Sequence, residues 1–199
     1  MLELVVASLD SEAEPLSGLL SEDERRRAGR LVFERDRRRY TVARARLRQL
    51  LGERLGAAPQ SLQFAYGARG KPALARRPGQ RDLRFNVSHC GDVAAYAFTE
   101  GREVGVDVEE VRVLPDADDV AMRFFSQRER AAYLRLPASE RPQGFFNCWT
   151  RKEAVVKAIG DGLSHPLETL DVSLAPAGWV LSSFVPAAGM VGAVAVQSA

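Results

Sequence analysis

The stretch from residue 104 to 109 constrains the fold of this chain most, because valine alternates there with another kind of residue at every step. It reads Val-Gly-Val-Asp-Val-Glu. Successive side chains of a β-strand point to opposite faces of the sheet. The three valines therefore face a core together, and Gly105, Asp107 and Glu109 share the other face. We expect a strand with one hydrophobic face and one face that carries carboxylates.

The carboxylates of Asp107 and Glu109 would lie roughly 6.5–7 Å apart along that strand, and they repel each other unless a cation lies between them. Oxygen ligands without His or Cys suit Mg²⁺, which binds one or two carboxylates and completes its shell with water and substrate phosphate. Gly105 on the same face leaves room for a ligand to approach the backbone. The segment alone leaves two interpretations open, a solvent-exposed polar face and a site for a hard cation.

Lysine is rare in this chain: of its 28 Lys and Arg residues, only Lys71, Lys152 and Lys157 are lysine. A lysine ammonium is a compact charge that can shift its pKa, whereas the guanidinium of arginine stays charged. The run from 149 to 157, Trp-Thr-Arg-Lys-Glu-Ala-Val-Val-Lys, places Trp149, Glu153 and Lys157 on one stripe of a helix. This stripe is either an ordinary surface Glu–Lys pair or a group for phosphate and proton chemistry. In the second interpretation Glu153 is a metal ligand or a base, and Lys157 meets phosphate charge.

Arginine is concentrated between Arg25 and Arg54, a segment with twelve arginines. The segment is either a solvated amphipathic helix or an anion site for phosphates. A non-enzymatic module that binds nucleic acid through it is a further alternative, although the net charge of +2 gives no support by itself. That alternative leaves the acids of the strand and of the helix unexplained, because acids that face phosphate are unfavourable without a metal.

The composition, with 46% hydrophobic and 27% charged residues, is that of a soluble globular protein. Cys90 and Cys148 are far apart in the sequence, which indicates neither a disulfide framework nor a zinc site and fits a reducing cytoplasm. The segment from Met1 to Val6 lacks the features of a signal peptide, and no apolar run approaches the ~18 residues of a membrane helix. We expect a cytoplasmic protein without a membrane segment.

Hydrophobic periodicity and turn residues predict helices followed by strands, given twice. Ser21 and Glu24 form a capping box that starts a helix near Glu22. The further predicted helices are 40–55, 117–136 and 142–159, and the predicted strands are 2–9, 83–88, 92–98, 104–109, 171–174, 179–184 and 190–196. This order predicts an α+β fold of two similar halves, residues 1–101 and 102–199, each with a small antiparallel sheet and a long helix.

Three motifs occur in order along the chain: Asn-Val-Ser-His at 86–89, Val-Gly-Val-Asp-Val-Glu at 104–109, and Phe-Asn-Cys-Trp-Thr-Arg-Lys-Glu-Ala-Val-Val-Lys at 146–157. Together they closely resemble the 4′-phosphopantetheinyl transferases of the surfactin-synthetase-activating type. The turn-rich loop from Tyr66 to Pro72 matches the Tyr-Gly-Lys-Pro-like segment of that family, with Ala68 and Arg69 as an insertion. The resemblance spans the chain from about Arg27 to Leu163.

The resemblance implies a Mg²⁺-dependent enzyme that transfers the 4′-phosphopantetheine group from coenzyme A to a serine of an apo acyl, peptidyl or aryl carrier protein and releases 3′,5′-ADP. It also implies a monomeric pseudo-dimer of two α+β halves, with coenzyme A in the cleft between them. A Mg²⁺-dependent hydrolase of nucleotide pyrophosphates is the enzymatic alternative. It would use the same acids and would need no protein acceptor.

The resemblance also implies roles for individual residues. Asp107, Glu109 and Glu153 would hold Mg²⁺, Glu153 would also activate the carrier serine directly or through water, and Lys157 would neutralise the phosphate oxygens. The phosphates of coenzyme A would be held by residues of both halves: Arg27, Arg39, Lys71, Ser88, His89, Asp107 and Lys157. From the residues alone, Ser88 and His89 are neighbours on a strand and point to opposite faces, so they do not form a Ser–His nucleophile pair.

The carrier protein is expected to dock on the segment that follows Glu109, because exposed apolar patches mark partner sites. The candidate residues are Val111, Leu114, Met122 and Phe125, with Arg112, Arg123 and Arg128 steering an acidic carrier. The alternative is that Met122 and Phe125 belong to the core of a helix. The residues do not indicate whether the carrier serves fatty-acid, polyketide or nonribosomal-peptide assembly.

Overall fold

The computed structural model describes residues 1–10, 13–67, 70–75, 79, 81–160, 162 and 165–199 of the chain. The N-terminal half forms a three-stranded antiparallel sheet in the order β1-β5-β4, with β2 and β3 as a separate hairpin. Its elements are β1 (Glu3–Ser8), α1 (Glu14–Ser17), α2 (Glu22–Gly29), α3 (Glu34–Leu55), η1 (Pro59–Ser61), β2 (Phe64–Tyr66), β3 (Pro72–Leu74), β4 (Leu83–Cys90) and β5 (Val93–Glu100).

The C-terminal half repeats this topology with a three-stranded antiparallel sheet in the order β6-β8-β7. Its elements are β6 (Val104–Glu110), α4 (Ala117–Phe124), α5 (Gln127–Leu134), α6 (Arg141–Ile159), η3 (Leu167–Thr169), β7 (Trp179–Phe184) and β8 (Met190–Gln197). In each half a strand precedes the helices, and the last strand of that half pairs with it. The expectation of two similar α+β halves, each with a small antiparallel sheet and a long helix, is confirmed.

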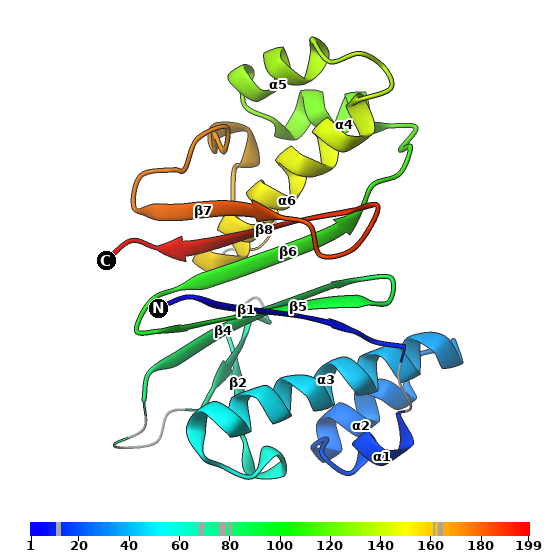
Figure 1. Ribbon diagram of the computed structural model, residues 1–199, viewed down its shortest axis with the longest axis vertical. Helices are drawn as coiled ribbons and strands as arrows, with labels where there is room; N and C mark the ends of the chain where they lie inside the picture. The colour runs from blue at the N-terminus through cyan, green and yellow to red at the C-terminus, as the bar shows by residue number, and fades with distance from the viewer. Residues whose placement is uncertain (11–12, 68–69, 76–78, 80, 161, 163–164) are drawn as a thin grey trace.

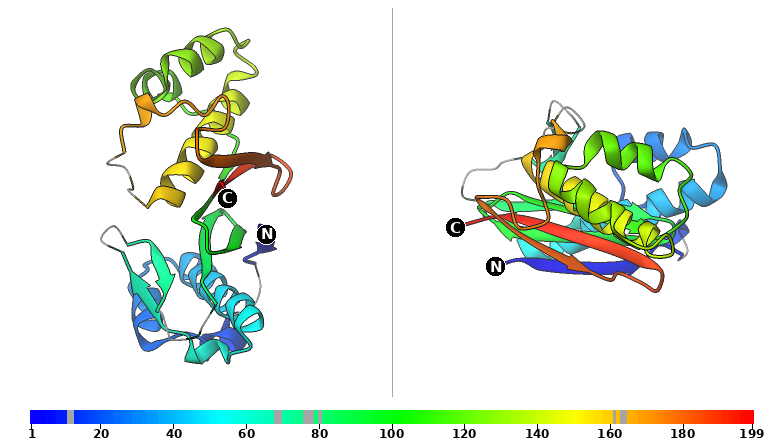
Figure 2. Two further views of the ribbon diagram at one scale, coloured as in Figure 1. Left: turned by 90° about the vertical axis from the view of Figure 1, so that its left-hand side faces the viewer. Right: turned by 90° about the horizontal axis from the view of Figure 1, so that it is seen from above.

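The two sheets lie face to face between the two long helices, so the molecule has four layers (Figures 1 and 2). α3 packs on one face of the N-terminal sheet through a core that includes Leu47, Phe85 and Tyr96. The other face of that sheet meets the valines of β6 and β8 in a second core with Ala95 and Ala97. α6 covers the outer face of the C-terminal sheet through a core of small residues: Ala154, Val155, Ala158, Ala193 and Ala195.

Local sequence signals account for several of the boundaries. Ser21 caps α2 and forms the predicted capping box with Glu24. Gly56 ends α3 with a φ of 60°, a left-handed conformation that favours glycine. α3 begins at Glu34, six residues before the predicted start at Tyr40. The three consecutive arginines Arg37, Arg38 and Arg39 therefore lie on this helix. No helix of the described residues is long and apolar enough to cross a membrane.

Two predicted elements are wrong. The helix expected over 117–136 is broken into α4 and α5, because Phe125 is extended and Ser126 starts a new helix through a capping box with Glu129. Residues 171–174 form no strand; Val172 is buried there instead, and its backbone N–H donates to the Glu129 carboxylate at 2.6 Å. The tertiary contact with Glu129 thus replaces a ladder of strand hydrogen bonds.

Candidate active site

Side chains of β4 make a row of contacts along β6, which we call the seam. β4 belongs to the N-terminal sheet and β6 to the C-terminal sheet, so the two strands are joined by side chains of alternate β4 residues. Arg84 donates to Glu103 at 2.8 Å, Asn86 accepts from the Val106 amide at 2.9 Å, Ser88 donates to Asp107 at 2.9 Å, and Cys90 donates to Glu109 at 3.7 Å. The seam places the polar end of β4 directly against the carboxylate strand.

Asp107 lies at the middle of the seam and is buried, with 4% of its surface exposed. Its Oδ1 accepts from Ser88 Oγ at 2.9 Å and from Lys157 Nζ of α6 at 2.6 Å. Its Oδ2 is also buried and has no hydrogen-bond partner within the described part of the chain. Buried polar atoms are nearly always paired, so the free Oδ2 marks a place where a cation or a donor from a ligand fits.

Glu153 lies four residues before Lys157 on α6 and is half-buried. Burial raises its pKa above the ordinary value. The charge of Lys157 opposes this rise, and the carboxylates of Asp107 and Glu109 add to it. Glu153 is therefore within electrostatic reach of both strand acids and of the lysine. We refer to Ser88, Asp107, Glu153 and Lys157 as the Asp107 group.

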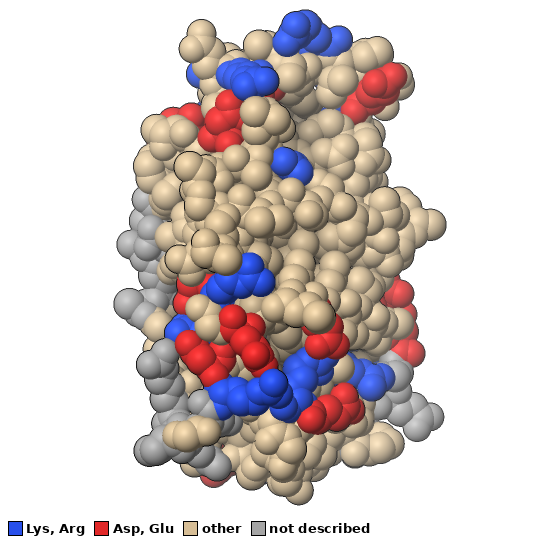
Figure 3. All heavy atoms as spheres, turned by 60° about the vertical axis from the view of Figure 1, so that its left-hand side comes forward, with Lys and Arg blue, Asp and Glu red and all other residues tan. Residues whose placement is uncertain are grey.

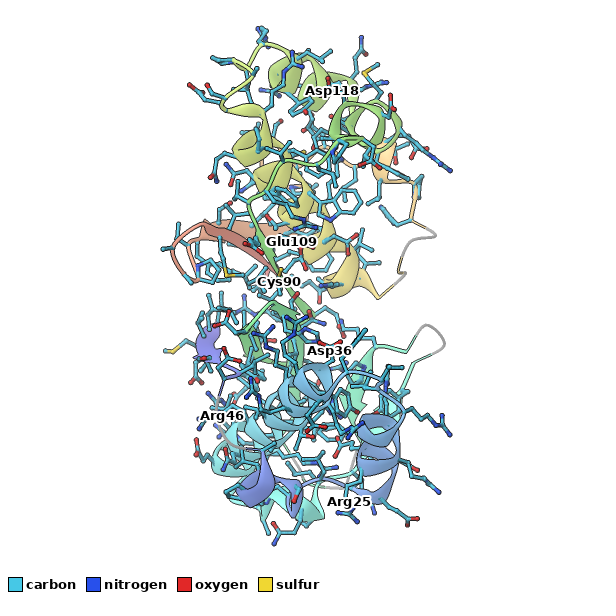
Figure 4. The ribbon with its side chains drawn as sticks, turned by 90° about the vertical axis from the view of Figure 1, so that its right-hand side faces the viewer. Arg25, Asp36, Arg46, Cys90, Glu109 and Asp118 are labelled. Atoms are coloured by element: carbon cyan, nitrogen blue, oxygen red, sulfur yellow. The ribbon has the colours of Figure 1, made fainter. Side chains whose placement is uncertain are left out.

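Glu109 lies at the end of β6, beside Cys90, at the level where the two halves meet (Figure 4). Its Oε2 accepts from Cys90 Sγ and, at 3.3 Å, from Arg112 Nη1. Among the described residues there is no group of three or more His, Cys, Asp or Glu side chains arranged to hold a metal. The three acids of the predicted metal set thus share one charged neighbourhood without converging on a single point.

His89 follows Ser88 on β4, and its side chain is exposed. Its pKa is lowered, because neighbouring atoms partly desolvate the imidazole and because the positive charge of Lys157 opposes protonation. A neutral imidazole beside an ammonium is suited to donate a hydrogen bond to an anion. The structure therefore brings His89 within electrostatic reach of Lys157 in the Asp107 group.

The other two lysines make ion pairs away from Asp107. Lys71 Nζ donates to Glu103 at 2.9 Å and to the carbonyl of Ala158, at the C-terminal end of α6, at 2.8 Å. Lys152 is completely buried, pairs with Glu129 at 2.7 Å and donates to the carbonyl of Leu167 at 2.9 Å. Lys152 is thus a structural residue that joins α6 to the segment after it.

The arginines of the N-terminal half are largely paired with acids. Arg48 is buried and donates to the equally buried Glu24 at 2.6 Å. Arg39 pairs with Asp10 at 3.3 Å, and Arg27 is exposed on α2. On the face in Figure 3, basic and acidic side chains lie beside each other over this half. The segment is accordingly a mixed surface with a buried Glu–Arg network.

Two expectations about the carboxylate strand and its surroundings are wrong. Gly105 leaves no room for a ligand, because a Cβ there would lie 2.0 Å from the Ala154 carbonyl oxygen and 2.4 Å from the Ala158 nitrogen. The glycine instead lets α6 approach the strand closely. Phe125 offers no docking surface, since it is fully buried and stacks on Phe145.

Sequence reasoning missed Asn86 as a member of the site. Asn86 is buried and shares a strand face with Ser88, and this two-residue spacing in the Asn-Val-Ser-His motif was the available signal. It named Arg112 only as a steering cation for the carrier and missed the pair of its guanidinium with Glu109. No sequence signal identifies that pair, because it depends on the turn that follows β6.

Comparison with known proteins agrees with this geometry. Residues 9–100 match the family model "4′-phosphopantetheinyl transferase, N-terminal", and residues 103–188 match "4′-phosphopantetheinyl transferase superfamily". The HetI 4′-phosphopantetheinyl transferase of Nostoc sp. is 39% identical over 94% of this chain and 82% of its own length. The Sfp 4′-phosphopantetheinyl transferase of Bacillus subtilis is 28% identical over 85% of this chain and 73% of its own length.

A human relative, L-aminoadipate-semialdehyde dehydrogenase-phosphopantetheinyl transferase, is 31% identical over 84% of this chain and 58% of its own length. The paired α+β halves, with an acid–lysine group on the seam between them, thus define a transferase. The chain belongs to the 4′-phosphopantetheinyl transferase superfamily, as the resemblance of its motifs implied.

Proposed function

We propose that this transferase moves the 4′-phosphopantetheine group from coenzyme A to a serine of an apo carrier protein, with Mg²⁺ as cofactor and 3′,5′-ADP as the second product. The observation that carries the proposal is the buried Oδ2 of Asp107, which has no hydrogen-bond partner among the described residues, beside the ammonium of Lys157 and the half-buried carboxyl of Glu153. Phosphoryl-type transfer depends mainly on positioning and charge neutralisation, and these three residues supply both.

The chemistry of the donor set suits a divalent cation, which Asp107, Glu109 and Glu153 would hold after their side chains turn toward one point. Oδ2 of Asp107 is available as a ligand, and oxygen donors without nitrogen or sulfur suit Mg²⁺. The pKa of Glu153 is raised first by burial and further by the two strand carboxylates, and a cation among the three acids would relieve that repulsion. When bound, Mg²⁺ neutralises charge on adjacent phosphates.

Glu153 is the proposed base. Its raised pKa makes its carboxylate a better proton acceptor than an ordinary glutamate. It takes the proton of the carrier serine hydroxyl, directly or through water. The serine oxygen forms a bond to the phosphorus that bears the pantetheine arm, and the bond from that phosphorus to the oxygen of 3′,5′-ADP breaks. Lys157 stabilises the negative charge that develops on the departing phosphate.

The remaining phosphate contacts are proposed for Ser88, His89, Lys71, Arg27 and Arg39. Ser88 Oγ already accepts from Lys157 Nζ at 3.1 Å, so both can turn to one phosphate. The pKa of His89 is lowered by partial desolvation of the imidazole and by the charge of Lys157, and a neutral imidazole can donate a hydrogen bond to an anion. Lys71 would exchange its bonds to Glu103 and the Ala158 carbonyl for a phosphate oxygen.

The proposed docking surface for the carrier follows β6. Val113 is 82% exposed and Met122 is 49% exposed, whereas Val111 and Leu114 are partly buried against the core of this half. The surface carries Arg112, whose guanidinium pairs with Glu109, so it is continuous with the proposed metal ligands. Exposed apolar residues beside cations suit an acidic partner.

The test is a reaction of the purified protein with coenzyme A, Mg²⁺ and a panel of apo carrier proteins, followed by intact-mass measurement. We expect a carrier to gain the mass of one phosphopantetheine group, with an equal amount of 3′,5′-ADP formed. A carrier whose acceptor serine is replaced by alanine is the control and should stay unmodified. Loss of coenzyme A at the same rate with and without a carrier would overturn the proposal in favour of a nucleotide pyrophosphate hydrolase.

A further inference from the structure

Asn86 differs from the other three β4 residues of the seam in the kind of group that it contacts. Arg84, Asn86, Ser88 and Cys90 alternate along β4 and therefore share one face of the strand, which is the face turned toward β6. Three of the four make a contact to a carboxylate of Glu103, Asp107 or Glu109. Asn86 bonds instead to the backbone of β6.

Asn86 is buried, with 6% of its surface exposed. Its Oδ1 accepts from the backbone N–H of Val106 at 2.9 Å. Two residues further on, Ser88 Oγ accepts from the Val108 N–H at 3.4 Å, a longer bond from an oxygen that also serves Asp107 and Lys157. The bond of Asn86 is the shorter of these two contacts to the backbone of β6, and it helps to set the register of β4 against β6.

This register decides where Ser88 and His89 stand. A strand advances about 3.3 Å per residue, so a shift of β4 by a fraction of one residue separates Ser88 Oγ from Asp107 Oδ1. The same shift moves His89 relative to Lys157. Misplacement of a catalytic group by about 1 Å can cost about 100-fold in rate. The bond of Asn86 thus affects the reaction through the positions of Ser88 and His89, although Asn86 itself does not contact the reacting groups.

We propose that Asn86 is a positioning residue for the transfer reaction, which holds β4 on β6 so that Ser88 and Asp107 stay paired. The proposal rests on the proposed function of the Asp107 group. It predicts that loss of the Asn86 acceptor weakens the neighbouring contacts of the seam as well as the bond to Val106. The chemical step should then be slower, while coenzyme A still binds.

The experiment uses the full chain with Asn86→Ala, and with Thr99→Val as the matched control. Thr99 is buried on the neighbouring strand β5, and its hydroxyl donates to the Arg102 carbonyl within the N-terminal half. Two quantities are measured: hydrogen exchange of the Val106 and Val108 amides by NMR, without substrate, and kcat and KM for transfer to a carrier. Asn86→Ser, whose shorter side chain does not reach Val106, repeats both measurements if the alanine variant does not fold.

We expect Asn86→Ala to speed exchange at both amides by about fivefold or more and to lower kcat by about tenfold or more, with little change in KM for coenzyme A. Thr99→Val should change neither amide and leave kcat near that of the wild type. Faster exchange at Val106 alone, with kcat as in the control, would overturn the proposal. A rise confined to KM for coenzyme A would also overturn it, because the chemical step would then be unaffected. Exchange is read without turnover, so a wild-type protein without transferase activity would refute the proposed function separately.

Discussion

Lys157 of α6 and Asp107 of β6 form an ion pair of 2.6 Å, and they share the hydroxyl of Ser88 from the other half of the molecule. A lysine and an aspartate so placed neutralise each other and leave one buried carboxylate oxygen, Oδ2, without a hydrogen-bond partner among the residues that the structure describes. The pair therefore places an ammonium and a carboxylate in one hydrogen-bond network where the two halves meet.

Removal of the charge of Asp107 should abolish transfer and spare the fold. We expect Asp107→Asn to lower kcat about 100-fold or more, because the carboxylate is needed for charge stabilisation in the transition state. Glu109→Gln should act in the same direction. The measurement is steady-state transfer over a range of Mg²⁺ concentrations, with Glu110→Gln, on the exposed end of the same strand, as the control. Wild-type turnover of either variant at limiting Mg²⁺ would falsify the proposed metal set.

Replacement of Lys157 by arginine should lower kcat even though the charge is kept. The guanidinium is a planar fork, which does not reproduce a compact ammonium that reaches both Asp107 and Ser88. We expect a loss of about tenfold or more with a nearly unchanged thermal midpoint. Arg112→Lys, an exchange of cation type beside Glu109, is the comparison. Equal losses in the two variants would show that the shape of the cation at position 157 is unimportant.

The pKa shift of Glu153 predicts a pH-dependent cost to stability. Its folded-state pKa lies above the ordinary 4.5, so the folded protein binds that proton more tightly than the unfolded chain. The stabilisation that protonated Glu153 gives the folded protein is fully present below pH 4.5, and it is lost as the pH rises through the folded-state pKa of this residue.

Glu153→Gln keeps the neutral form at every pH. In buffer with a metal chelator we expect this variant to unfold at higher denaturant concentration than the wild type at pH 7, and at the same concentration below pH 4.5. Urea titrations at both pH values measure this difference. A variant less stable than the wild type at pH 7 would contradict the prediction.

Lys152 should matter for stability and not for chemistry. Lys152→Met leaves the buried carboxylate of Glu129 without its cation, and breaking a buried pair on one side costs roughly 3–5 kcal/mol. Urea unfolding measures this loss. Arg26→Met, which removes an exposed pair with Asp23, should leave the unfolding free energy close to that of the wild type. Transfer by folded Lys152→Met at low temperature should persist; its complete loss there would assign Lys152 to the active site.

A negative charge at Val113 should weaken docking of the carrier. Val113 is 82% exposed on the proposed surface, so Val113→Asp adds repulsion toward an acidic partner without disturbing the core. We expect KM for the carrier to rise and KM for coenzyme A to stay the same, in kinetics with both substrates varied. Leu174→Asp, at another exposed apolar position (65%), is the control. An equal rise in both variants would place the docking surface elsewhere.

The sequence predicted features that depend on residues close together in the chain. The period-two pattern of residues 104–109 predicted which side chains of β6 face the hydrophobic layer, and the capping box at Ser21 predicted the start of α2. The break between α4 and α5 had an equally local signal, Ser126 with Glu129, which the apolar pattern obscured.

Other features depend on partners that are distant in the sequence. The pattern around Gly105 cannot reveal that α6 approaches within contact distance. The helical run around Lys152 cannot reveal that Glu129 and two carbonyl groups bury its ammonium. In both cases the sequence shows the residue but not its neighbour in space, because tertiary packing brings that neighbour from a distant part of the chain.

The strand order of the C-terminal sheet has a consequence for synthesis of the protein. β6 carries two of the proposed metal ligands, yet its backbone partner is β8, the central strand of its sheet, which follows β6 by about 80 residues in the sequence. During translation β6 has no backbone partner in its own sheet until residues 190–197 have left the ribosome. A chain truncated before β8 would therefore carry every proposed catalytic side chain and lack the strand that pairs with β6.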